Sequence, residues 1–209
     1  MKRHKVILFQ LFLLAISVII SINFFSKTTS TEILLDLAEK TKNPTRIVAV
    51  VDGVEIYQEN IDFMLKANEV SKENSAQQIF DNDILQNETV NKDAVLNNRI
   101  RSIVIYNEAK RLGLEADYEE AYQIAKNAYD ATKAQNDENY ALLVDYMKKL
   151  KFSEDEYIEL ITETYQNLMT QSNLYSNFIK DKTGTDEEFN EMFELYVEDL
   201  IKKAKIEYK

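Results

Sequence analysis

A long apolar run near the N-terminus constrains this chain more than any other feature. The run covers residues 6–25 and follows three basic residues, Lys2, Arg3 and Lys5. At about 20 residues it matches the ~30 Å hydrocarbon core of a bilayer, whereas the apolar part of a cleaved signal is usually about 7–15 residues long. We therefore predict that residues 1–26 form a signal anchor containing one transmembrane helix.

The orientation of this anchor follows from its positive flank. Basic residues stay on the cytoplasmic side of a membrane, so the chain after Lys27 is expected outside the cytoplasm. The protein would then be a single-pass protein of the cell membrane. Secretion after signal cleavage is the alternative, although Phe24 and Phe25 stand where a cleavage site needs small residues. Residues 27–45 are expected to form a juxtamembrane stalk, and residues 46–209 a folded domain.

Charge argues against nucleic acid as a partner. The net charge of the chain is −11. Removing residues 1–26 takes away Lys2, Arg3 and Lys5 and no acidic residue, which leaves −14. An acidic domain repels phosphate backbones. The same net charge predicts that any bound polypeptide segment is basic or apolar rather than acidic.

The residue types that most enzymes need are scarce. The chain has no cysteine, and its only histidine is His4, in the basic flank of the anchor. A thiolate nucleophile, a histidine base and a histidine-ligated metal are therefore excluded from the domain. None of the three glycines belongs to a phosphate-binding loop. We predict no catalytic residues, no cofactor, no metal site and no enzymatic activity.

The sequence of the domain predicts a mainly helical fold with a few short strands. Residues 47–51 are β-branched, and the Asp52-Gly53 turn leads to a second short run at 54–56. Residues 205–208 are the other strand-like stretch. We expect residues 47–51 to pair antiparallel with about 204–208, because a lone buried strand leaves its amides and carbonyls unpaired.

Capping signals mark several helices. Asn91 can begin a helix that Gly113 closes, with Leu114 behind it as in a Schellman motif. This helix is apolar on more than one face, so it is expected in the middle of the fold. Asp117 with Glu120, Ser153 with Glu156, and Thr185 with Glu188 have capping-box spacing. The last two helices are expected at about 154–180 and 186–203.

Aromatic residues supply the candidate binding positions. The chain has 12 Tyr and 10 Phe, but no Trp. Tyr122 and Tyr129 lie two turns apart on one helix face, and Met169 lies on another helix. Such side chains usually pack in a core. They can also form an adaptable apolar surface for polypeptides, and on that reading Tyr122, Tyr129 and Met169 are the substrate-binding residues.

Several segments, in this order, resemble the SurA/PrsA-type chaperone domain. The most specific is the central helix, which contains the sequence EAKRLGL at residues 108–114. The others are the strand-turn-strand opening at 48–56, the helix starts at 117–121 and 152–157, and the closing strand at 204–207. The resemblance implies a multi-helix chaperone lobe, closed by its first and last strands, that holds unfolded exported polypeptides (clients).

Many members of that family carry an inserted parvulin-type prolyl isomerase domain, for which this chain has neither the length nor the histidines. The resemblance therefore implies a membrane-anchored extracytoplasmic holdase without isomerase activity. The alternative is a dedicated scaffold or regulator at the cell surface that binds one protein partner. The sequence alone leaves both open, together with the oligomeric state.

The membrane topology can be tested directly. Protease added outside intact cells should degrade the domain, while the protein should stay with the membranes after a carbonate wash. Both results follow from an uncleaved anchor with the domain outside. A soluble form whose N-terminus lies near residues 26–30 would contradict the anchor.

Overall fold

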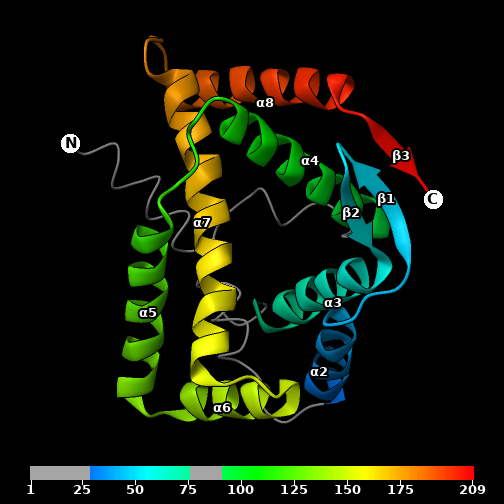
Figure 1. The fold of residues 1–209 in the computed structure, drawn as a ribbon, viewed down its shortest axis with the longest axis vertical. Coiled ribbons are helices and arrows are strands. Elements are labelled where there is room, and N and C mark those ends of the chain that lie inside the picture. The colour runs from blue at the N-terminus through cyan, green and yellow to red at the C-terminus, as the bar shows by residue number, and fades with distance from the viewer. Residues whose placement is uncertain (1–28, 76–90) are drawn as a thin grey trace.

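The computed structural model describes residues 29–75 and 91–209. Most of the described chain is helical, with one small antiparallel sheet (Figure 1). This confirms the expected fold class in its coarse form. The elements in chain order are α2 (Thr29–Thr41), β1 (Ile47–Val51), β2 (Val54–Tyr57), α3 (Gln58–Ser75), α4 (Lys92–Arg111), α5 (Tyr118–Gln135), α6 (Glu138–Leu150), α7 (Glu154–Ile179), α8 (Asp186–Lys203) and β3 (Ile206–Tyr208).

The sheet has β1 at its centre, in the order β2-β1-β3. The turn between β1 and β2 places Asp52 and Gly53 at φ values of 49° and 87°. Two successive residues with positive φ are typical of a type I′ hairpin turn, which matches the natural twist of the strands. Ala49 and Val51 of β1 are fully buried.

The predicted pairing of the two ends of the domain is confirmed. Ala49 of β1 lies opposite Tyr208 of β3, and Val51 lies opposite Ile206. Asp52 strengthens this closure at one end of the strands. Its backbone N–H donates to the Lys205 carbonyl at 3.0 Å, and its carboxylate accepts from the Lys205 N–H at 2.8 Å.

The predicted helix boundaries are largely confirmed. Asn91 caps α4, and the N–H groups of Gly113 and Leu114 donate to the carbonyls of Lys110 and Ala109, which completes a Schellman motif. Complete capping boxes begin α7 at Ser153 and α8 at Thr185. At Asp117 only the bond from the Glu120 N–H is present within the described chain. That start is an N-cap without the reciprocal bond.

Helix α7 is the long central helix against which other helices pack, and we call it the spine. It is about 39 Å long at 1.5 Å per residue and has α5 along one side, while α4, α3 and the sheet lie on the other (Figure 1). Helices α6 and α8 cross its two ends. One apolar core is shared by α5, α6 and α7, a second by the sheet, α3 and α4, and a third by α4, α7 and α8. As expected from its several apolar faces, α4 takes part in two of these cores.

Polar side chains of α7 attach the link between α4 and α5. The fully buried Thr170 accepts a hydrogen bond from the Ala116 N–H at 3.0 Å. Gln166 and Asn173 donate to the carbonyls of Ala116 and Leu114. These bonds satisfy backbone groups that would otherwise be costly to bury, and they hold α5 against the spine.

Helix α2 falls within the stretch expected as a stalk, and it packs against α3 and α6. Its Ala38 is buried. The predicted anchor at residues 6–25 lies outside the described residues. Within the ranges 29–75 and 91–209, no helix is long and apolar enough to cross a bilayer.

Deleting residues 204–209 should destabilise the whole domain, because β1 loses one of its two neighbouring strands. The lost backbone hydrogen bonds and the half-buried Ile206 contribute about 3 kcal/mol by typical magnitudes. We expect the melting midpoint to fall by roughly 5–10 °C. The control is Tyr208→Ala, which removes a side chain that is 65% exposed and should change little. An unchanged melting curve for the deletion would contradict the closure role of β3.

Candidate functional site

An open groove lies where α2 meets α6 and the start of α7. Its volume is about 510 Å³, within the range typical of sites for small ligands or side chains. One wall is polar, made of Thr41, Lys42 and Asn43 at the end of α2. The remaining lining is largely apolar and consists of Ala38, Tyr146, Leu150, Phe152 and Leu160.

Local backbone signals build both walls of this groove. Helix α2 ends at Thr41, ahead of Pro44, because the residue before a proline avoids helical geometry. Helix α6 ends at Leu150, and Lys151 adopts a left-handed φ of 56° that reverses the chain. The Phe152 N–H then donates to the Met147 carbonyl at 2.9 Å. This turn brings Phe152 back against the end of α6.

Charged groups surround the apolar floor. The Lys42 ammonium lies 3.9 Å from the centre of the Phe152 ring, a cation–π contact. Lys149 of α6 binds Asp36 of α2 at 2.6 Å, which holds the pKa of the Asp36 carboxyl below its usual value. Tyr146 is neutral at physiological pH like any ordinary tyrosine, and burial raises the pKa of its phenol further. The groove is thus an uncharged aromatic floor beside a basic rim.

A second hollow, of about 680 Å³, lies between α4, α8 and the Asp52 turn. Its charged groups are largely engaged with one another or with neighbouring residues. Glu108 accepts from Arg111 at 2.6 and 2.7 Å and from the Tyr196 hydroxyl at 2.8 Å. Lys203 is paired with Asp199. This hollow is explained by the packing of α8 against α4, and it is the weaker candidate for a binding site.

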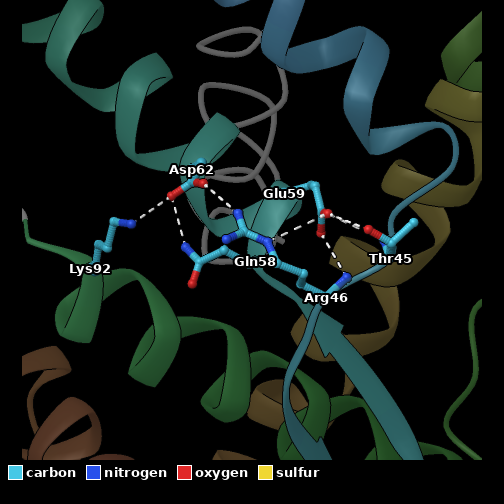
Figure 2. Close-up of polar contacts among 6 residues, drawn as sticks. All are labelled: Thr45, Arg46, Gln58, Glu59, Asp62 and Lys92. Carbon is cyan, nitrogen blue, oxygen red and sulfur yellow. Dashed lines mark hydrogen bonds and ion pairs between the residues drawn. The ribbon is translucent and has the colours of Figure 1, made fainter. Parts of the chain in front are cut away.

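Another concentration of charge joins the segment just before β1 to α3 and α4 (Figure 2). Figure 2 shows Asp62 facing Lys92, with which it forms an ion pair of 2.9 Å. Hydrogen bonds from backbone N–H groups, its own included, lower the pKa of Glu59. Each carboxylate has several donors, so the cluster fixes elements in place and leaves no acceptor poised for chemistry. Its members are Thr45, Arg46, Gln58, Glu59, Asp62 and Lys92.

The three residues predicted to bind polypeptides lie in one cluster, but outside the groove. Tyr129 is a buried member of the core shared by α5, α6 and α7, with 2% of its surface exposed. Tyr122 and Met169 are half-buried and pack against the same core. Their packing accounts for their helical spacing, and a role in binding stays a prediction.

Sequence reasoning missed the groove residues, although one signal was available. Leu160 is 41% exposed, whereas Tyr157, Ile158 and Ile161 on neighbouring positions pack in the core. Four apolar residues within five positions are too many for one buried helix face. Such an excess indicates a second apolar contact surface on α7.

Comparisons with models of protein families, with curated proteins and with solved structures found no match. Within the described residues, no group of acidic or histidine side chains is arranged to hold a metal ion. The groove therefore has to be interpreted from its own geometry.

Replacing Tyr129 tests whether its side chain stabilises the core or serves to bind polypeptides. Tyr129→Ser should lower the free energy of unfolding by about 3–5 kcal/mol, the usual cost of removing a buried aromatic ring. Tyr129→Phe should cost much less, because it keeps the ring. It removes only a buried hydroxyl that lies near Tyr140 and Glu154 but makes no hydrogen bond of normal geometry with the described residues. Urea denaturation followed by circular dichroism measures both. A Tyr129→Ser protein of unchanged stability would contradict the core placement.

Proposed function

We propose that this protein is a membrane-anchored extracytoplasmic holdase that binds unfolded or exported polypeptides in the groove between α2, α6 and α7. The observation that carries the proposal is an open groove with an apolar floor and a charged rim, held in a helical lobe that its first and last strands close. A holdase needs apolar surface for its clients and surrounding charge that keeps the loaded complex soluble.

The closure of the lobe supports the family resemblance. In SurA/PrsA-type domains the opening and closing strands are expected to pair around the helices, and β1 pairs with β3 here. Such a lobe holds a groove at fixed geometry without nucleotide or metal. The proposal therefore includes no energy source and no bound cofactor.

The proposed function excludes prolyl isomerase activity. Only residues 180–185 separate α7 from α8, which is where many family members carry the isomerase. The domain also has no histidine. The activity proposed is holding alone.

Aggregation assays test the proposal. The full chain in neutral nanodiscs should delay aggregation of several unrelated unfolded proteins at near-stoichiometric ratios, without nucleotide. Leu160→Ser should weaken this effect because it removes apolar surface from the groove. Leu195→Ser is the matched control, since Leu195 is 65% exposed on α8 and does not line the groove. Both variants should keep the wild-type melting midpoint.

One outcome would contradict the holdase, and another would contradict its location in the groove. If the intact protein delays aggregation of no unrelated client, a dedicated scaffold or regulator with one partner becomes the better interpretation. Crosslinking in intact membranes separates these functions, because a holdase gives many partners and a scaffold gives one in fixed ratio. If Leu160→Ser and Leu195→Ser reduce the delay of aggregation equally, the binding surface lies outside the groove.

A further inference from the structure

Five lysines gather at the corner of the molecule that holds the groove. They come from two chain segments, residues 39–42 and 148–151, which together contain a single acidic residue, Glu39. Packing of α2 against α6 and the Asp36–Lys149 ion pair bring the segments together. We call the set the basic corner; its members are Lys40, Lys42, Lys148, Lys149 and Lys151.

Most of these lysines form no close ion pair within the described residues. Across the described ranges, no acidic side chain lies within ion-pair distance of Lys40, Lys42, Lys148 or Lys151. By contrast, both lysines of α4, both lysines of α5 and Lys203 of α8 form ion pairs. Helix dipoles favour lysine at the end of a helix. That effect explains each lysine in its own helix, but not the meeting of two such ends beside an apolar groove.

Two carboxylates close to the groove, Asp36 and Glu156, are already engaged. Asp36 is bound by Lys149, and Glu156 accepts from the backbone N–H and hydroxyl of Ser153. Lys40 and Lys42 also act on Asp36 and Glu156 at longer range. In an acidic chain with a net charge of −11, the basic corner still holds five lysines against these two carboxylates. Because charges more than ~8 Å apart are largely screened at physiological ionic strength, these lysines act more strongly on a segment in the groove than the distant acidic residues of the domain do.

We propose that the groove selects polypeptide segments in which a large apolar or aromatic side chain lies next to Asp or Glu. The inference rests on the proposed function, since it names the client class of the same site. The apolar side chain packs against Phe152 and Leu160, and the neighbouring carboxylate pairs with Lys42 or Lys151. This preference is opposite to the one expected from the net charge of the whole domain.

The concave shape favours a polypeptide over a membrane surface as the occupant. A single side chain can enter a groove of about 510 Å³, whereas a flat layer of lipid headgroups cannot reach its floor. Lys42 also stands over the ring of Phe152, so its charge is held at the edge of the apolar floor. An acidic-aromatic segment satisfies both features at once.

Three labelled peptides of identical length test the preference. Each carries the same Phe and Leu residues, flanked by Glu, by Gln or by Lys. Binding to the full chain in neutral nanodiscs is measured by fluorescence anisotropy at physiological salt. The Glu peptide should bind about fivefold more tightly than the Gln peptide, because an exposed ion pair contributes up to ~1 kcal/mol. The Lys peptide should bind most weakly.

Charge-neutral variants locate the effect. The double variant Lys42→Gln with Lys151→Gln should lose the preference for Glu, so that the Glu and Gln peptides bind with equal affinity. The control is Lys180→Gln with Lys202→Gln, which removes the same charge at exposed lysines away from the groove and should retain the preference. Equal binding of all three peptides, or a preference that survives in the corner variant, would overturn the proposal.

Two further results separate this inference from others. If the corner variant loses binding to vesicles containing anionic lipid but keeps its peptide preference, the basic corner faces the membrane and the client class proposed here is wrong. If no peptide binds and no aggregation is delayed, the holdase function itself fails. If aggregation is delayed but the three peptides bind equally, the holdase function is supported. The proposal that the basic corner selects acidic segments is then wrong.

Discussion

The backbone pairing of β1 is the interaction on which the rest of the structure depends. Its Ala49 and Val51 are fully buried, and a buried strand must satisfy its amides and carbonyls on both edges. One edge is satisfied by the adjacent hairpin strand, and the other by the last residues of the chain. The helices between β1 and β3 therefore have to leave the sheet and return to it, so α8 must end beside the Asp52 turn.

This closure produces an open arrangement of helices around α7 instead of a single compact bundle. The core of α5, α6 and α7 lies at one end of the spine, and the sheet with α3 and α4 lies on its other side (Figure 1). Helix α2 contacts both α3 and α6. It therefore joins the two parts, and the groove forms along that contact, with α7 contributing Leu160. A holdase binding in this groove would sit at the junction between the two parts of the lobe, close to the chain that leads from the predicted anchor.

Local signals were sufficient for much of the fold, but not for the site. Asn91, Ser153, Thr185 and Gly113 mark helix ends through short-range hydrogen bonds, so their effect is visible in neighbouring residues alone. The spacing of Tyr122, Tyr129 and Met169 was also legible, but spacing does not distinguish a core from a binding surface. The groove depends on contacts between α2 and α6, which are more than 90 positions apart along the chain, and no local pattern encodes such a contact.

The sequence by itself determined the mainly helical class, the capped helix boundaries, the pairing of the two end strands and the absence of histidine and cysteine chemistry from the domain. The helical class, the helix boundaries and the missing residue types depend on residue type or on hydrogen bonds between near neighbours. The pairing of the end strands joins distant residues, but it could be expected because a buried strand must satisfy its backbone groups. The tertiary structure alone decided that Thr170 is buried against the Ala116 backbone and that Tyr129 lies in a core. It also decided that Lys42 lies over the Phe152 ring and that Lys149 of α6 pairs with Asp36 of α2. Burial and charge clustering are properties of which faces meet, and packing of the whole chain sets those faces.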